Sequence, residues 1–208
     1  MLNIFFDFDG TLIDARKRLY RLFQDLVKES NLSEDTYWAL KRDRKNHEFI
    51  LKHIFYWSDD KIAFFKNRWL EAIELKRYID LDVLKPHVCD VLAELQKTSK
   101  LYLVTARQDK AMLEYELCRF TIKSFFLKVL VTGLQVSKSA LIEQSFSNME
   151  SGFFIGDTGY DIKTGKALKL STIAVTDGFL SGEKLREYDP DFLVDSLTAI
   201  PKIIGGSI

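Results

Sequence analysis

Short runs of consecutive apolar residues alternate, from about residue 86 onward, with segments whose apolar residues follow helical spacing. One further apolar run stands at the start of the chain, at residues 2–6. The later runs lie at 101–106, 128–133, 152–157, 171–176 and 192–196. Nearly continuous apolar strands that alternate with helices are typical of a parallel sheet covered on both faces. The pattern therefore predicts an α/β fold with a doubly wound parallel sheet.

The stretch from about residue 14 to residue 80 has a different pattern. Its apolar residues keep helical spacing, and it contains neither glycine nor proline. Ser33 and Ser58 stand where helix N-caps are expected, each with acidic residues just after it. We expect about four packed helices here. The predicted organisation is a core domain, residues 1–14 and 82–208, interrupted by a helical insertion at residues 15–81.

The composition is that of an ordinary globular protein. The 208 residues are 47% hydrophobic, and 30 Lys and Arg balance 30 Asp and Glu, with a sequence pI near 6.8. This balance gives no indication of a nucleic-acid partner. No apolar run reaches the length of a membrane span, and the N-terminus does not resemble a signal peptide. The two cysteines match no metal-site spacing, and we expect a cytoplasmic protein. We also expect it to be monomeric or homodimeric.

Polar side chains follow the predicted strands at their carboxyl ends, where ligands bind in open α/β sheets. These residues are Asp7, Asp9, Thr11, Thr105, Lys138, Asp157 and Asp161. Carboxylates beside a lysine and two hydroxyls form a site for a hard divalent cation and an oxyanion, and Mg²⁺ prefers such oxygen ligands. Concentrated carboxylates repel one another without a cation, so the set predicts Mg²⁺.

Four ordered motifs carry a resemblance to a known family. They are DFDGTL at 7–12, VTAR at 104–107, Ser137-Lys138 and GDTGYD at 156–161. In this order they resemble the motifs of the haloacid dehalogenase (HAD) superfamily, in its phosphoglycolate phosphatase and β-phosphoglucomutase-like branch. The resemblance implies a Rossmann-like HAD core with an inserted helical cap.

The resemblance also implies roles for the acidic residues. Asp7 would be the nucleophile that accepts the phosphoryl group, and Asp9 the general acid and then the base that activates water. The Mg²⁺ ligands would be the Asp7 and Asp157 carboxylates and the backbone carbonyl of Asp9. Asp161 would be a second metal-side carboxylate, either a ligand or an anchor for a lysine or a metal-bound water.

The remaining motif residues would surround the phosphate. Thr105 and the backbone N–H of Ala106 would hold the transferring group, and Lys138 would neutralise charge on Asp7 and the phosphoryl oxygens. Thr11 is placed with Ala106 among the cofactor-contacting residues. Physical reasoning agrees, because phosphoryl transfer needs mainly positioning and charge neutralisation.

Several of these residues have a plainer interpretation. Thr105 alone would be a helix N-cap, Lys138 a surface lysine, and Asp161 an acidic residue of a first helical turn. Arg107 departs from the family pattern, where many relatives carry a small polar residue; it either contacts the phosphate or forms a surface ion pair.

The function predicted in this way is a Mg²⁺-dependent phosphatase that hydrolyses a small phosphorylated metabolite through an aspartyl phosphate. Two alternatives remain open: a phosphomutase of the β-phosphoglucomutase type, and a catalytically silent binding module on the same fold. Asp9 argues against a true dehalogenase, because those relatives lack this second aspartate.

The helical insertion would be a cap that determines which ester is accepted. The first candidates for selecting an anionic substrate are Arg16, Arg18, Arg42 and Arg44. Residues 14–82 hold 15 basic and 13 acidic groups, so solvated helix faces remain the plainer interpretation of these arginines.

Overall fold

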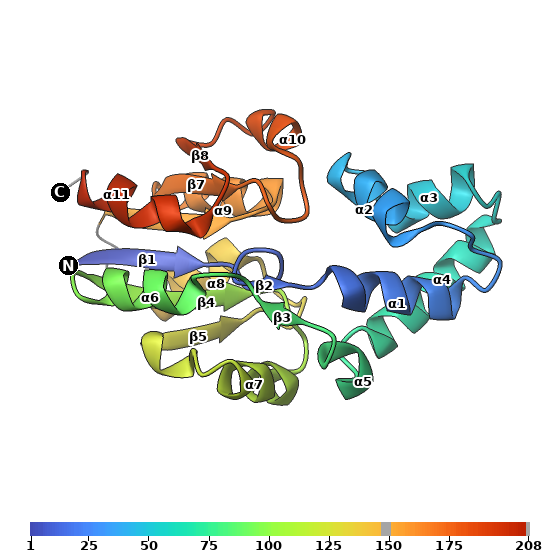
Figure 1. Cartoon of the computed structure of the whole chain (residues 1–208), viewed down its shortest axis with the longest axis horizontal. Helices are drawn as coiled ribbons and strands as arrows, with labels where there is room; N and C mark the ends of the chain where they lie inside the picture. The colour runs from blue at the N-terminus through green and yellow to red at the C-terminus, as the bar shows by residue number, and fades with distance from the viewer. Residues whose placement is uncertain (147–150, 207–208) are drawn as a thin grey trace. The chain divides into compact units, whose positions relative to one another are not determined.

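The computed structural model of the chain describes residues 1–146 and 151–206. It divides into two units, each with its own internal contacts. The core unit comprises residues 1–14 and 84–208, and the helical unit comprises residues 15–83 (Figure 1).

A six-stranded sheet with the order β5-β4-β1-β6-β7-β8 forms the centre of the core unit. Every pairing in this sheet is parallel. Its strands are β1 (Leu2–Phe6), β4 (Ser99–Thr105), β5 (Lys128–Val131), β6 (Gly152–Gly156), β7 (Ser171–Val175) and β8 (Phe192–Val194). The first apolar run therefore becomes a central strand, and the carboxyl ends of its neighbours meet at the same edge.

Helices cover both faces of the sheet, as successive side chains of β1 show. Ile4 and Phe6 pack in one apolar cluster with α6, α7 and α11, whereas Phe5 packs on the opposite face against residues that include Ile142 of α8. The helices are α6 (Val88–Gln96), α7 (Lys110–Arg119), α8 (Lys138–Ser145), α9 (Gly159–Ala167), α10 (Gly182–Arg186) and α11 (Ile200–Gly205). The doubly wound α/β prediction is confirmed.

The helical unit contains five helices over residues 15–83, all of which the structure describes. They are α1 (Arg16–Leu26), α2 (Glu34–Arg42), α3 (His47–His53), α4 (Asp59–Ala72) and α5 (Lys76–Ile79). Ser33 and Ser58 are N-caps, each accepting a hydrogen bond from a backbone N–H of the first turn. The one-turn α5 is the helix that exceeds the expected four.

The boundary of the helical unit lies two residues later than the predicted 81. Asp82 lies in this unit, and its carboxylate accepts a hydrogen bond from Arg18 Nε at 3.0 Å, with both side chains almost fully buried. Two short strands near the ends of the insertion, β2 (Ile13–Asp14) and β3 (Val83–Leu84), form a second sheet.

None of the helices within residues 1–146 and 151–206 is long and apolar enough to cross a bilayer. Cys89 and Cys118 are free thiols.

Candidate active site

The loop after β1 turns sharply at Gly10, and this turn requires glycine. Gly10 has φ +82°, a left-handed conformation that a side chain disfavours. A Cβ atom there would lie 2.2 Å from Asp157 Oδ2 and 2.6 Å from a ring carbon of Phe179. The glycine of the DFDGTL motif thus lets the loop approach the Asp157 carboxylate.

Three carboxylates converge where β1 and β6 end. Asp7 follows β1, Asp157 follows β6, and Asp161 lies in the first turn of α9. One oxygen of each lies within 4.8 Å of the others, and all three residues are buried. We call Asp7, Asp157 and Asp161 the carboxylate cluster. The structure therefore brings together residues that are separated by up to 154 positions in the chain.

Lys138 enters this cluster from the start of α8, whose N-cap is Ser137. Its Nζ lies 2.5 Å from Asp7 Oδ1 and 2.7 Å from Asp161 Oδ1. The Lys138 side chain is only 3% exposed, which excludes the plain surface lysine. Lys138 can thus neutralise charge directly beside the Asp7 carboxylate.

The ionisation of the cluster follows from burial and like charges. Burial raises the pKa of Asp7 well above its usual value, against the attraction of Lys138, and Asp161 and Asp157 raise it further. Burial and Asp161 also raise the pKa of Asp157, to about 7. Burial alone would lower the pKa of Lys138, but Asp161 and Asp7 outweigh it and raise the pKa. The site therefore stabilises added positive charge.

Neighbouring groups hold the Asp157 carboxylate in one orientation. Thr11 Oγ1 donates to Oδ1 at 3.1 Å, and the backbone N–H of Phe179 donates to Oδ2 at 2.6 Å. Thr11 is fully buried, so its hydroxyl orients a carboxylate of the cluster.

Asp161 has two structural partners besides its place in the cluster. Its Oδ2 accepts hydrogen bonds from the backbone N–H and the hydroxyl of Thr158, which forms a capping box at the start of α9. Its Oδ1 accepts from Lys138. Asp161 is thus both an acidic residue of a first helical turn and an anchor for Lys138.

The donor set fits a hard divalent cation. Three buried carboxylates face one lysine, so two negative charges exceed what Lys138 balances. Oxygen donors of this kind are the ligands that Mg²⁺ takes. The carboxylates of Asp7, Asp157 and Asp161 could hold such an ion.

The Asp9 carboxylate is not one of the three clustered carboxylates and contacts Arg107. Nε of Arg107 lies 2.6 Å from Asp9 Oδ2, and Nη2 lies 2.9 Å from Oδ1. Arg107 is 4% exposed and also lies against Glu116. Arg107 therefore forms an ion pair, but its side chain is buried and does not lie at the surface as the plainer interpretation expected.

Thr105 closes β4 and is 1% exposed. Its hydroxyl accepts a hydrogen bond from the backbone N–H of Arg107 at 3.3 Å. The N-cap of the next helix is Asp109, so Thr105 is not a helix cap. Ala106, beside it, is exposed. The phosphate-holding role of Thr105 and Ala106 remains a prediction.

Two buried charged residues near the site were not predicted from the sequence. Glu116 is fully buried in α7 between the apolar positions Leu113 and Leu117, and a carboxylate on that face was the available signal. Lys85 is 7% exposed and donates to the Gly10 carbonyl and, at 2.7 Å, to Asp177 Oδ1. Its place before Pro86 indicates no role by itself.

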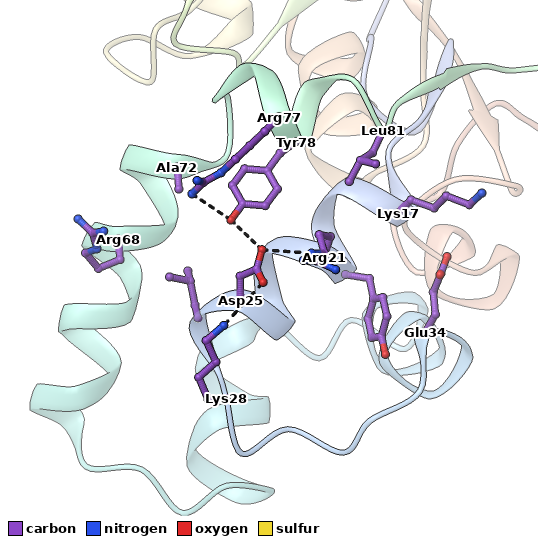
Figure 2. Close-up of a pocket in the computed structure, with 12 residues that line it drawn as sticks. Lys17, Arg21, Asp25, Lys28, Glu34, Arg68, Ala72, Arg77, Tyr78 and Leu81 are labelled. Atoms are coloured by element: carbon purple, nitrogen blue, oxygen red, sulfur yellow. Dashed lines mark hydrogen bonds and ion pairs between the residues drawn. The ribbon is translucent and has the colours of Figure 1, made fainter.

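The helical unit contains a groove of about 800 Å³ (Figure 2). Its charged lining consists of Lys17, Arg21, Lys28, Arg68, Arg77, Asp25 and Glu34. Asp25 stands at the centre of a small network, in which it accepts hydrogen bonds from Arg21 Nε and the Tyr78 hydroxyl. Five basic side chains against two acidic ones give the groove a positive excess.

The four arginines expected to select the substrate do not line this groove. Arg18 is 2% exposed and its guanidinium pairs with Asp82, so this candidate is wrong as a substrate contact. Arg16, Arg42 and Arg44 lie outside the lining.

Comparison with known proteins agrees with the geometry of the core unit. Residues 4–175 match the family model described as haloacid dehalogenase-like hydrolase. A pyrophosphatase PpaX from Oceanobacillus iheyensis is 24% identical over 213 residues, covering 99% of this chain and 97% of that protein. A phosphoglycolate phosphatase from Synechococcus elongatus is 24% identical over 209 residues, covering 94% of this chain and 93% of that protein.

A solved structure shares the fold over nearly the whole chain. The haloacid dehalogenase-like hydrolase from Streptococcus pneumoniae superposes with a TM-score of 0.80 and 22% identity, covering 98% of each chain. The family model spans the first motif, the loop after β4, Lys138 and the GDTGYD motif. The chain therefore belongs to the haloacid dehalogenase-like hydrolases.

Proposed function

We propose that this chain is a Mg²⁺-dependent phosphatase that hydrolyses a small phosphorylated metabolite through an aspartyl phosphate on Asp7. The observation that carries the proposal is the contact of Lys138 Nζ with Asp7 Oδ1, at 2.5 Å, inside a cluster of three buried carboxylates. Family membership and the names of the two curated relatives support phosphate esters or anhydrides as substrates.

The chemistry follows from what each side chain can do. An Asp7 oxygen attacks phosphorus, the bond to the leaving oxygen breaks, and Asp9 gives that oxygen a proton. Lys138 balances the negative charge that remains on the phosphoryl oxygens. Mg²⁺, when bound, supplies positive charge that keeps the carboxylates ionised and neutralises the phosphoryl group. Water then hydrolyses the aspartyl phosphate, which divides one difficult displacement into two easier ones.

The helical unit, in this proposal, is the cap that selects the substrate. Its basic groove is the support, because five basic side chains against two acidic ones favour an anionic ligand. We expect Arg68→Met together with Arg77→Met to raise KM for the natural phosphate ester several-fold. The same pair should leave hydrolysis of a small aryl phosphate unchanged, since that substrate offers little beyond its phosphoryl group.

The decisive experiment is a phosphate-release assay across sugar phosphates, phosphoglycolate, pyrophosphate and nucleoside monophosphates, with Mg²⁺ and with EDTA. Acid quenching in the same assay traps phosphorylated protein. We expect phosphate release with Mg²⁺ and none with EDTA. We expect the trapped phosphoryl group on Asp7. Full activity in EDTA would contradict the metal assignment, and transfer of that group to a second sugar instead of water would identify a mutase.

A control variant tests whether loss of activity is specific to the aspartates of the site. Asp189 is an exposed aspartate that pairs with Lys166 at the surface. Asp189→Asn should therefore keep wild-type turnover and phosphoprotein. Absence of phosphate release from every substrate by the folded wild-type protein would favour the silent binding module.

A further inference from the structure

Arg107 is a buried charged side chain that the proposed steps do not use. Its position is fixed by backbone contacts, because its N–H donates to Thr105 Oγ1 at 3.3 Å and its carbonyl accepts from Gly133 N at 3.1 Å. The residue is 4% exposed, and its guanidinium carbon lies 5.6 Å from the centre of the Phe8 ring. The loop and Phe8 therefore hold Arg107 beside the first motif.

The guanidinium of Arg107 contacts both oxygens of the Asp9 carboxylate. Nε to Oδ2 measures 2.6 Å and Nη2 to Oδ1 measures 2.9 Å. A two-point contact of this kind sets the position and the plane of a carboxylate, which a lysine cannot do. Both Asp9 oxygens therefore accept hydrogen bonds from Arg107 in this arrangement.

Glu116 holds the other end of the same guanidinium. Its Oε2 lies 2.9 Å from Arg107 Nη1, and the Glu116 side chain is fully buried in α7. A buried carboxylate is strongly destabilising unless a cation faces it. We call Asp9, Arg107 and Glu116 the ion-pair triad.

We propose that Arg107 is a positioning residue that holds the Asp9 carboxylate for the hydrolysis of the aspartyl phosphate, and that Glu116 holds Arg107 in place. The inference rests on the proposed function. In this step water attacks phosphorus and a water proton passes to Asp9. The bond between phosphorus and the Asp7 oxygen breaks, which releases inorganic phosphate and the Asp7 carboxylate.

The test is rapid quenching of the full-length protein with an aryl phosphate and Mg²⁺, comparing wild type, Arg107→Lys, Asp9→Asn and the double variant. An aryl leaving group needs no acid, so the first step remains fast and the second becomes visible. Arg107→Lys keeps a cation for Asp9 and Glu116 but loses the two-point contact.

We expect Arg107→Lys to lower kcat on the order of 10–100-fold, less than the 10²–10⁴-fold typical of a lost general acid–base group. Phosphorylated protein should accumulate in this variant, and the rate of its formation should change less than about two-fold. In the Asp9→Asn background, Arg107→Lys should have no further effect, because Arg107 acts through Asp9.

A second line uses Glu116→Gln, which keeps the shape of the side chain and removes its charge. We expect it to produce the same accumulation in a milder form. The matched controls are Glu114→Gln, a glutamate of the same helix whose side chain is 47% exposed and pairs with Lys123, and Arg186→Lys, an exposed arginine of the core unit. Both controls should behave as wild type. Arg107→Met with Glu116→Gln removes both charges together and tests the triad if Arg107→Lys folds poorly.

Two results would overturn the inference. One is an Arg107→Lys effect that persists in full in the Asp9→Asn background, because Arg107 would then act without Asp9. The other is slower formation of phosphorylated protein with an unchanged rate of hydrolysis. If wild type itself forms no phosphorylated protein, the proposed function fails and the inference fails with it; if wild type forms it, only the role of Arg107 is at stake.

Discussion

Charged side chains are arranged differently in the two units of this protein. In the core unit Lys138, Asp7 and Asp161 meet with at most 9% of each side chain exposed. In the helical unit, pairs such as Lys61 with Glu29 and Lys66 with Glu48 leave about half or more of each side chain in solvent. Buried charges cost stability, whereas exposed pairs contribute little. The core charges are therefore best explained by chemistry, and most helical-unit charges by solubility.

The largest effect should follow from removing the Asp7 carboxylate. Asp7→Asn should lower kcat at least ~10⁴-fold, because the proposed nucleophile is lost. In EDTA at neutral pH its melting temperature should rise, since the raised pKa of Asp7 marks a carboxylate that is unfavourable when ionised. Turnover assays and thermal melts measure the two effects. Near-native turnover in a folded Asp7→Asn protein would contradict the nucleophile role.

Arg18 tests whether burial, rather than the unit in which a charge lies, decides how much an ion pair contributes to stability. It is a buried, paired charge of the helical unit, and Arg18→Met leaves Asp82 buried without this partner. We expect a loss of about 3–5 kcal/mol in the free energy of unfolding. Urea unfolding measures it, with Arg68→Met as the matched control. A loss no larger than that of the control would remove the distinction between buried and exposed pairs.

The stability of the folded chain should depend on pH because the core unit contains buried carboxylates. The folded pKa of Asp7 and Asp157 is raised, to about 7 for Asp157, from the usual 3.8. Between about pH 4 and pH 7 the folded chain binds more protons than the unfolded chain, so stability falls as pH rises. Each pKa unit corresponds to about 1.4 kcal/mol, so the fall should be on the order of a few kcal/mol.

This pH effect is measured by urea unfolding in EDTA at about pH 5 and about pH 7.5. Saturating Mg²⁺ should flatten the dependence, because the cation stabilises the ionised carboxylates and the folded chain that binds it. Asp157→Asn should flatten it in EDTA as well. A stability that rises with pH in EDTA would contradict the assigned direction.

The smallest effect should come from the exposed pairs. Arg68→Met breaks its contact with Glu71, whose side chain is 61% exposed. We expect a change of at most about 0.5 kcal/mol in the free energy of unfolding, and none in aryl phosphate turnover. A change above about 2 kcal/mol would show that surface pairs of the helical unit contribute to the fold as buried ones do.

The contrast between the units also explains what the sequence could predict. Strands and the first motif follow from local pattern: β1 ends at Phe6, and DFDGTL comes directly after it. Convergence of Lys138 with Asp7 follows from parallel-strand topology. By contrast, the Arg107–Glu116 contact depends on how α7 packs, and the burial of Arg18 depends on where the chain returns at Asp82. Short helices such as α5 and α10 carry too few residues for a periodic signal.

Asp161 has a structural role that Asp7 and Lys138 lack, since it completes the capping box of α9. A descendant of this chain that lost its chemistry would still need an acid there to begin the helix. The N-cap of α8 is Ser137 and not Lys138, and burial makes the ionised carboxylate of Asp7 unfavourable in the folded chain. A genome annotator who meets the motif GDxxxD should therefore treat its last aspartate as a mark of ancestry, and look to the lysine and the aspartate of the first motif for a working enzyme.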